Sequence, residues 1–419
     1  MKKILLAGTA IVGAAILASP AQADLKIDLG GHFRGYGVFA DNDETGGAGT
    51  SNDLRGFEFK RDMEVHFSGE TTTDSGLTVG VHAELDLGNE SNDAGVPSAL
   101  PAPWTNTQDL DPNQLDEAYI YFSGGWGRVN FGSEDGAAYL LQVAAPSADS
   151  NVDGMRVYVT GLNTDVWDDG VVNGSYGGAG NNFTLALSYD NAFFRDTDRL
   201  TYLTPKWNGF QAGLSYAPKQ GQQAVNEAFA GMTTDDDSTD YEDLWEVAAR
   251  WDGEFEGFGI SIGAGYSTAD AENGSAFVAG TFGSDDITAW DAGATVSWND
   301  FSLGVAYRNF TDTGGASVAA GADEEIETWV VGAAWDNGPY HLGASWLNTD
   351  IDAAAFGISG GAAGENIEVD RFTVGGGYTY GPGMTFRGAV AFGSADEDIG
   401  LTNTSTDFMQ VTIGTDVNF

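Results

Sequence analysis

The sequence predicts an all-β fold, namely a 16-stranded antiparallel transmembrane β-barrel. Three observations point to this fold. Segments in which apolar and polar residues alternate recur from Asp24 to the last residue. The connections between them are short and long in turn, so one end of the structure carries turns and the other carries loops. Tryptophan and tyrosine gather at the ends of the segments, as they do at the two interfaces of a membrane.

The first 23 residues have the pattern of a signal peptide. Lys2 and Lys3 precede an uncharged stretch over residues 4–20, and Ala21-Gln22-Ala23 matches an A-x-A cleavage site. We therefore expect cleavage after Ala23, which leaves residues 24–419 as one barrel domain. The competing interpretation is a membrane anchor, but the apolar run is short for a span and no basic residues follow it.

Composition restricts the class of protein. The chain has 419 residues, no cysteine, 60 glycines and a formal net charge of −45. Without cysteine there are no disulfides, thiolate metal sites or thiol nucleophiles. A charge of this sign, with no basic stripe, argues against a nucleic-acid partner, because phosphates are also negative. No stretch after the first 23 residues has the length and apolar character of a membrane-spanning helix.

The segment 289–310 shows the repeating unit in full. Its first strand places Trp290 and Trp298 on one face and Asp291 on the other, which is the two-residue period of a strand. Residues 299–300 turn the chain, and the return strand alternates again. One face of the hairpin is apolar with aromatic residues at its rim, and the other is small, polar or charged.

This alternation predicts sixteen strands, an even number as in outer-membrane barrels. They cover residues 25–39, 57–70, 77–88, 115–123, 126–132, 199–207, 210–217, 244–252, 258–268, 289–298, 301–310, 327–336, 340–349, 370–380, 383–393 and 408–419. Short turns are expected at 71–76, 124–125, 208–209, 253–257, 299–300, 337–339 and 381–382. Long loops are expected at 40–56, 89–114, 133–198, 218–243, 269–288, 311–326, 350–369 and 394–407.

The region 133–198 leaves eighteen strands as an alternative. Residues 183–189 alternate well enough to be a strand, and 155–159 is a possible partner. We favour sixteen because 198–217 already forms a complete hairpin after this loop. In addition, no short turn joins the two extra candidates.

The aromatic residues predict two girdles. The first lies beside the short turns and contains Trp126, Trp207, Trp251, Trp298 and Trp335. The second lies near the loops and contains Trp245, Trp290, Trp346, Tyr266 and Tyr307. The competing interpretation, aromatic residues in the core of stacked sheets, does not predict tryptophan in register with the turns.

Two stretches resemble the general-diffusion porins of Gram-negative bacteria, closest to the alphaproteobacterial type. They are 116–136, DEAYIYFSGGWGRVNFGSEDG, and 199–216, RLTYLTPKWNGFQAGLSY, and the chain ends in a strand closing on Phe419 as members of that family do. The resemblance implies a homotrimer of barrels in the outer membrane, each with an inward-folded third loop that narrows a pore for small hydrophilic solutes and ions. It also implies that Phe419 is an assembly signal. The loop 133–198 is longer than expected for the family, and the short acidic loop-tip motif of enterobacterial porins is missing.

Pore-lining residues are therefore predicted from position. If Phe33, Val65 and Val81 face lipid, alternation turns a basic wall toward the lumen, made of Arg34, Lys60, His82 and Arg128. Across the pore, we expect the third loop to present Glu134, Asp135, Asp149 and Asp153. The two sets would make a transverse field at the constriction. In the competing interpretation, the basic side chains are solvated and paired with Glu58, Asp62, Glu64, Glu84 and Asp86 on the same strands.

The overall charge predicts a preference for cations, because acidic loops raise the cation concentration at the mouth of the pore. One acidic cluster is also a candidate Ca²⁺ or Mg²⁺ site, because these ions take carboxylate oxygens: Asp235, Asp237, Asp240 and Glu242. No stretch matches the EF-hand pattern, so a solvated acidic face is the competing interpretation. We expect no other cofactor and no catalytic residues.

One arc of the barrel predicts subunit contacts. Strands 14 to 16 and 1 to 4 become neighbours when the barrel closes and contain no tryptophan, unlike strands 5 to 13. Gly31, Gly35 and Gly37 face outward on the first strand, and Arg61 faces outward on the second. Arginine facing lipid is costly near the membrane midplane, so we expect this arc to pack against neighbouring subunits. A local bulge that turns Arg61 inward is the competing explanation.

Function classes other than a pore fit the sequence less well. Residues 357–361 match G-x-S-x-G, but a nucleophile elbow needs a strand-turn-helix context and this stretch lies in a glycine-rich loop. A soluble secreted calcium-binding β-protein would show a fixed nonapeptide repeat, which is missing. A substrate-specific outer-membrane channel is the alternative within the pore class, and the sequence does not separate it from a general one.

Overall fold

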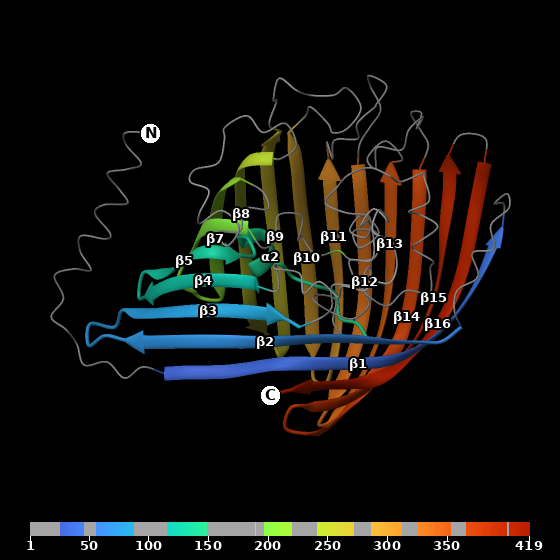
Figure 1. Cartoon of the computed structure of the whole chain (residues 1–419), viewed down its shortest axis with the longest axis horizontal. Helices are drawn as coiled ribbons and strands as arrows, with labels where there is room; N and C mark the ends of the chain where they lie inside the picture. The colour runs from blue at the N-terminus through green and yellow to red at the C-terminus, as the bar shows by residue number, and fades with distance from the viewer. Residues whose placement is uncertain are drawn as a thin grey trace, which may run out of the picture.

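The computed structural model describes residues 26–45, 56–87, 115–148, 189, 197–219, 241–271, 286–311, 325–352, 366–399 and 402–419. Sixteen strands form one closed barrel in which each strand pairs antiparallel with its sequence neighbours. β1 pairs with β16 and so closes the sheet. In Figure 1, β1 to β5 run across the view and β10 to β16 run upright, as the wall curves around the lumen. The predicted fold class and strand number are confirmed.

The strands are β1 (Lys26–Thr45), β2 (Glu58–Thr72), β3 (Thr78–Asp86), β4 (Leu115–Gly124), β5 (Gly127–Glu134), β6 (Thr197–Leu203), β7 (Phe210–Lys219) and β8 (Tyr241–Phe255). They continue with β9 (Phe258–Ala271), β10 (Ile287–Trp298), β11 (Phe301–Thr311), β12 (Glu325–Asn337), β13 (Tyr340–Asp352), β14 (Asn366–Gly381), β15 (Met384–Ile399) and β16 (Thr402–Asn418). A short helix, α2 (Ala137–Leu140), follows β5. No helix in the described ranges is long and apolar enough to cross a membrane.

The alternative with eighteen strands is excluded by the pairing of β5 with β6. Their register runs without a break from Arg128 opposite Leu203 to Glu134 opposite Thr197. No further strand can lie between them. Of the two extra candidates, 155–159 and all of 183–189 except Tyr189 lie outside the described residues.

The predicted long loop at 394–407 is wrong. β15 and β16 continue to pair through this region, as far as Ile399 opposite Thr402. The hairpin therefore extends well past the point where its apolar alternation ends. Beyond the lipid both faces of a strand meet water, so its side chains no longer alternate although its backbone still pairs.

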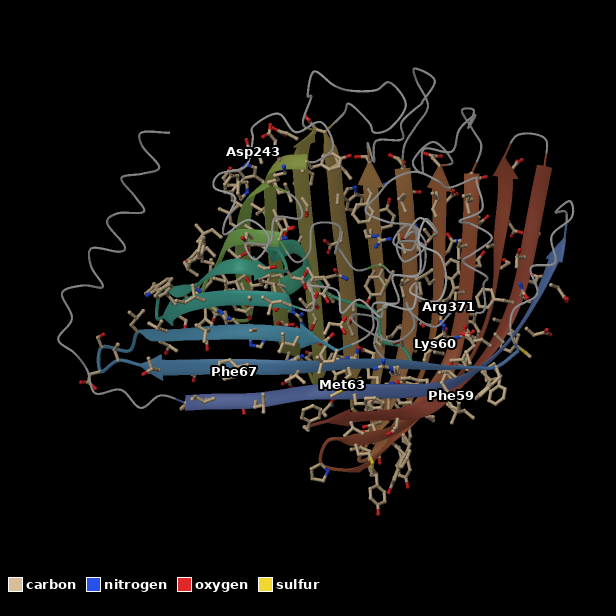
Figure 2. All side chains as sticks on the ribbon, in the orientation of Figure 1. Phe59, Lys60, Met63, Phe67, Asp243 and Arg371 are labelled. Carbon is tan, nitrogen blue, oxygen red and sulfur yellow. The ribbon has the colours of Figure 1, made fainter. Side chains whose placement is uncertain are left out.

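The outer face of the barrel is apolar. Large side chains are exposed there, from Tyr202 at 36% to Phe59 at 82%. Figure 2 shows Phe59 on the outer side of β2, and Lys60 and Arg371 on the inner side of the barrel. The two aromatic girdles are present: Trp298 lies in register with Phe301 near a turn, and the Trp290 and Tyr307 rings are 4.6 Å apart nearer the other end.

Arg61 faces outward, as its parity predicts. β2 pairs with β1 without any register shift, and Arg61 lies opposite Gly35. The proposed bulge that would turn Arg61 inward is therefore wrong. Its side chain is exposed, and it donates a hydrogen bond to the Leu87 carbonyl at 3.4 Å.

The outward glycines of β1 have a use within the chain itself. Each lies beneath a phenylalanine ring: Gly31 beneath Phe419, Gly35 beneath Phe33 and Gly37 beneath Phe57. A Cβ added at Gly35 would lie 2.9 Å from the Phe33 ring and one at Gly37 would lie 3.2 Å from the Phe57 ring, whereas one at Gly31 would overlap the Glu64 carbonyl oxygen. These contacts favour glycine at all three positions within a single chain.

Candidate functional site

The candidate site is the inner face of the barrel, which has two different parts. We call the inward side chains of β1 to β5 the β1–β5 wall, and those of β7 to β13 the β7–β13 wall. Residues 137–148, which we call the inner segment, are joined to the second of these walls by the hydrogen bonds described below. Alternation fixes which residues belong to each wall, because the outward neighbours form the exposed apolar face.

The β1–β5 wall carries all four predicted basic residues, and each has a partner on that wall. Arg34 Nη1 lies 3.0 Å from Asp62 Oδ2, and Lys60 Nζ lies 2.8 Å from Glu58 Oε2. His82 Nε2 lies 2.7 Å from Glu84 Oε1. The geometry therefore has the pairing that the competing interpretation predicted.

Arg128 is held differently, by aromatic rings. Its guanidinium lies 4.0 Å from the centre of the Tyr121 ring and 5.9 Å from that of Tyr119. Its Nε donates to Asn130 Oδ1 at 2.6 Å. The Tyr121 hydroxyl in turn donates to Glu70 Oε2 at 2.9 Å, so the group is anchored to β2.

The acidic residues at the start of the third loop do not lie across the pore from the basic wall. Glu134 is the last residue of β5 and accepts a hydrogen bond of 2.5 Å from Asn130, which is also the partner of Arg128. The backbone N–H of Asp135 donates to Glu117 on neighbouring β4 at 3.4 Å. Both residues therefore belong to the same side as the basic wall, because β5 continues farther than predicted. Asp149 and Asp153 lie outside the described residues.

The candidate divalent-cation cluster falls mostly outside the described residues, which do not include Asp235, Asp237 and Asp240. Glu242 lies on β8, in register with Lys219 of β7 and Asp270 of β9. With Glu242 the one member in the described ranges, a Ca²⁺ or Mg²⁺ site there stays a prediction.

The β7–β13 wall holds the inner segment by hydrogen bonds. The first N–H groups of a helix have no partner within it. Here the N–H of Ala137 donates to Ser215 Oγ at 2.8 Å, and that of Ala138 to Glu246 Oε2 at 3.2 Å. Figure 1 shows α2 lying among β7, β8 and β9.

Beyond α2, the wall donates to carbonyl groups of the inner segment. Arg250 Nη1 donates to Gln142 O at 3.2 Å, and Thr295 Oγ1 donates to Ala144 O at 2.9 Å. Farther along, His341 Nε2 lies 2.8 Å from Ser147 O. The inner segment therefore runs across the wall from β7 to β13.

A row of inward glycines lets the backbone of the inner segment lie directly on the sheet. A Cβ added at Gly293 would overlap the Val143 carbonyl oxygen, and one added at Gly332 would overlap that of Pro146. Gly343 and Gly263 also lie against carbonyl oxygens of the inner segment, those of Ser147 and Leu141, whereas Gly213, Gly265 and Gly304 lie against side-chain atoms of Ala137, Ala138 and Pro146. Sequence reasoning missed this row. Its signal was glycine at inward parity on successive strands.

A buried ion pair supports the start of the inner segment. Arg199 Nη1 lies 3.1 Å from Glu246 Oε1, and the two side chains are only 1% and 3% exposed. The other oxygen of Glu246 is the acceptor for Ala138. This pair joins β6, β8 and α2, whereas the Lys60–Glu58 pair of the β1–β5 wall is about 40% exposed, at 44% and 39%.

Space remains beside the inner segment. A recess of about 500 Å³ is lined by Tyr139, Leu140, Gln142, Val143, Ala144, Arg250, Ser261 and Thr295. It is open on one side and has both polar and apolar lining atoms. It is therefore suited to water and small hydrophilic solutes rather than to one tightly enclosed ligand.

The last residue takes part in closing the barrel. The Gly31 N–H donates to Phe419 O at 3.0 Å, and the Phe419 N–H donates to Gly31 O at 3.1 Å. The Phe419 side chain is 57% exposed on the outer face. Its predicted role as an assembly signal is compatible with this accessible position but is not tested by it.

Comparisons with known proteins agree with this architecture. The model of the Gram-negative porin family matches residues 7–398. No curated protein sequence matches the chain.

Several solved structures share the fold. An anion-selective porin from Comamonas acidovorans is 13% identical, with a TM-score of 0.56 over 94% of this chain and 100% of its own. In-vitro folded OmpT of Vibrio cholerae is 12% identical, with a TM-score of 0.55 over 96% and 99%. A trimer form of the same protein is 10% identical, with a TM-score of 0.50 over 93% and 99%.

Proposed function

We propose that the pore of this protein admits small hydrophilic solutes and ions with a preference for cations. The chain belongs to the Gram-negative porin family. Members of this family are outer-membrane channels for passive diffusion and not enzymes. The observation that carries this proposal is the closed wall itself. Outside it are exposed apolar side chains, and inside it are charged, polar and small ones. Water fills a lumen of that kind, and its charge selects among the solutes.

The preference for cations rests on the charge of this chain. Its formal net charge is −45, and the basic side chains of the β1–β5 wall are mostly paired with carboxylates. The Comamonas acidovorans structure is of an anion-selective porin, but a likeness at 13% identity concerns the fold alone. We expect a reversal potential of cationic sign in a planar bilayer under a KCl gradient. An anionic sign would overturn the preference.

We further propose that the constriction lies between the β1–β5 wall and the inner segment. The basic side is Arg34, Lys60, His82 and Arg128. The acidic side then includes Asp149 and Asp153, which follow the inner segment in the sequence. Glu134 and Asp135 lie on the basic side itself, so their negative charge reduces the field rather than adding to it. The transverse field would orient dipolar solutes.

Neutralising three of these residues tests the constriction. Arg34→Gln, Lys60→Gln and Arg128→Gln combined should change single-channel conductance and shift selectivity further toward cations. Arg61→Gln is the matched control, because it removes one positive charge from the outer face of the same sheet. Unchanged currents in the triple variant would remove the basic side chains from the constriction. Liposome swelling with sugars of graded size would separate a general pore from a substrate-specific channel.

We also propose that the protein is a homotrimer assembled through the arc of β14 to β16 and β1 to β4. Arg61 is exposed on this arc, and so is a group of phenylalanine rings, with Phe57 4.6 Å from Phe39 and 4.9 Å from Phe59. A neighbouring subunit would remove Arg61 from lipid. The trimer form of Vibrio cholerae OmpT has the same fold. Native mass measurement in mild detergent tests the state, and a monomer would contradict it.

We also propose roles for both ends of the chain. Residues 1–23 act as a signal peptide, so N-terminal sequencing of the purified protein should begin at Asp24. The two stretches 116–136 and 199–216 favour the alphaproteobacterial type. Phe419 acts as the assembly signal, so Phe419→Ala should lower the amount of folded barrel in the outer membrane. Normal insertion of that variant would contradict this role.

A further inference from the structure

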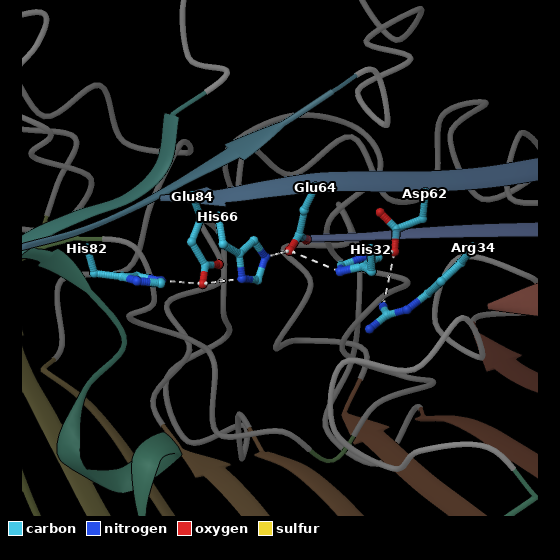
Figure 3. Close-up of polar contacts among 7 residues, drawn as sticks. All are labelled: His32, Arg34, Asp62, Glu64, His66, His82 and Glu84. Atoms are coloured by element: carbon cyan, nitrogen blue, oxygen red, sulfur yellow. Dashed lines mark hydrogen bonds and ion pairs between the residues drawn. The ribbon is translucent and has the colours of Figure 1, made fainter. Parts of the chain in front are cut away.

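Three histidines and three carboxylates form a continuous row on the inner face of β1, β2 and β3 (Figure 3). The order along the row is His82, Glu84, His66, Glu64, His32 and Asp62. The register of the strands creates the row, because Glu64 lies opposite His32 and Glu84 lies opposite His66. The row lies on the β1–β5 wall, whereas the hydrogen bonds described above hold the inner segment to the β7–β13 wall.

Histidine and carboxylate alternate at ligand-like distances in the middle of the row. Oε2 of Glu64 lies 3.0 Å from Nε2 of His66 and 3.6 Å from Nδ1 of His32. Two ligands bound to one Zn²⁺ at about 2.0–2.2 Å lie about 3.0–3.6 Å apart for angles between right-angled and tetrahedral. One ligand atom from each of the three residues lies within 4.8 Å of the other two. The two carboxylate–imidazole distances therefore fit a coordination sphere.

We propose that His32, Glu64 and His66 bind one divalent transition-metal ion, such as Zn²⁺. Two imidazoles and one carboxylate are a nitrogen and oxygen set that first-row ions prefer over Mg²⁺ or Ca²⁺. The ligands use Nδ1 of His32, Oε2 of Glu64 and Nε2 of His66. The remaining coordination positions face the lumen and take water, because the His66 side chain is 32% exposed.

The second nitrogen of each ligating ring meets a carboxylate. Nε2 of His32 lies 3.0 Å from Asp62 Oδ2, and Nδ1 of His66 lies 3.4 Å from Glu84 Oε1. An outer carboxylate that accepts the ring N–H fixes the tautomer and makes the ring a stronger metal ligand. Arg34 holds Asp62 in place at 3.0 Å. The row thus supplies both the ligands and the groups that orient them.

A second set of three groups competes for the same ion. His66 Nδ1 and His82 Nε2 lie 3.4 and 2.7 Å from Glu84 Oε1. In that arrangement the outer partner of His82 Nδ1 is the hydroxyl of Ser68, at 2.7 Å. A neutral hydroxyl stabilises a ligating imidazole less than a carboxylate does. We therefore assign the ion to the first set, where both rings have carboxylate partners.

Metal binding to the folded barrel in detergent tests the proposal directly. Zn²⁺ is added in the presence of millimolar Mg²⁺, which competes for nonspecific binding to carboxylates, and is measured by calorimetry and by elemental analysis after desalting. We expect one Zn²⁺ per chain in the wild type. His32→Gln and His66→Gln should abolish this stoichiometric binding. Asp62→Asn should weaken it about tenfold or more, as for other outer partners of metal-binding histidines.

His82→Gln is the matched control, because it removes a histidine of the same row and should keep binding within about twofold of wild type. Heat-dependent migration on gels shows that each variant is a folded barrel. Zn²⁺ binding by His66→Gln as tight as by wild type would overturn the proposal. So would loss of binding in His82→Gln with retention in His32→Gln, which would place the ion in the second set. Because these readouts need no current, they do not depend on the proposed pore function.

Discussion

The two inner walls of the barrel use the same strand alternation in opposite ways. On the β1–β5 wall, charged side chains find partners among one another, as Arg34 does with Asp62. On the β7–β13 wall, glycine replaces side chains at inward positions, and the inner segment occupies the space. The β1–β5 wall therefore lines the lumen with charged side chains, whereas the β7–β13 wall is covered by a second layer of backbone.

The two walls also differ in how much an ion pair contributes to the stability of the barrel. An exposed pair contributes little, because water solvates both partners nearly as well as they solvate each other. A buried pair costs free energy to form, but loss of one partner leaves a charge without compensation. The Arg199–Glu246 pair is buried and the Lys60–Glu58 pair is half-exposed, so mutations should affect the two walls very differently.

The largest effect is expected for Glu246→Ala on the β7–β13 wall. It leaves the Arg199 guanidinium buried without its carboxylate and removes the acceptor for Ala138. We expect the free energy of unfolding to fall by about 3–5 kcal/mol, measured by urea denaturation from detergent micelles. Glu246→Gln, which keeps an acceptor oxygen, should lose less. A loss below about 1 kcal/mol would show that this pair behaves like an exposed one.

The glycine row predicts the next largest effect. Gly293→Val and Gly332→Val each place a side chain where a carbonyl of the inner segment lies. We expect each to cost about 1–3 kcal/mol of stability and to lower the single-channel conductance, because the inner segment is displaced toward the pore axis. Gly388→Val is the control, because an added Cβ there comes no closer than 3.7 Å to any atom beyond its chain neighbours. Equal effects at Gly388 would contradict a specific role for the row.

Arg128→Met sharpens the description of the β1–β5 wall. It removes the guanidinium over the Tyr121 ring and the bond to Asn130. We expect a loss of about 0.5–2 kcal/mol together with a stronger cation preference, because one positive charge leaves the lumen. The reversal potential before and after substitution measures the second effect. A reversal potential that does not move would place Arg128 away from the ion path.

The smallest effect is expected for Glu58→Gln. Its partner Lys60 is 44% exposed, and the pair lies 2.8 Å apart in reach of lumen water. The change in the free energy of unfolding should be about 0–1 kcal/mol, measured under the same conditions as for Glu246→Ala. A loss as large as that of Glu246→Ala would erase the proposed contrast between the two walls.

Most of the fold could be predicted because alternation is a local property. The face of Arg34, Lys60, His82 and Arg128 follows from counting residues along each strand, and the structure places all four on the inner wall. The extension of β15 to Ile399 could not be predicted, because polar residues on both faces give no alternation to read. For the same reason the strand predicted to end at residue 132 continues to Glu134. Glu134 and Asp135 were therefore predicted across the pore, although they lie on the same side as the basic wall.

The organisation of the site was harder to predict than the fold. The partner of a side chain depends on the register between two strands. This register cannot be deduced from the sequence of either strand alone. Asp62 meets both His32 and Arg34 only because β1 and β2 align as they do. The glycine row required knowing that Gly263 and Gly293 lie side by side, and that the chain after β5 returns across them.

The seam between β1 and β16 joins the two ends of the synthesised chain. The Tyr36 hydroxyl, on β1, donates to Asp416 on β16 at 2.5 Å across a sequence separation of 380 residues. Contacts so distant in sequence form slowly, because a long stretch of chain must be ordered first. No ribosome-bound fragment lacking β16 can complete this cylinder. The barrel can therefore close only after the last strand has been synthesised, so every earlier strand waits with an unpaired edge until then.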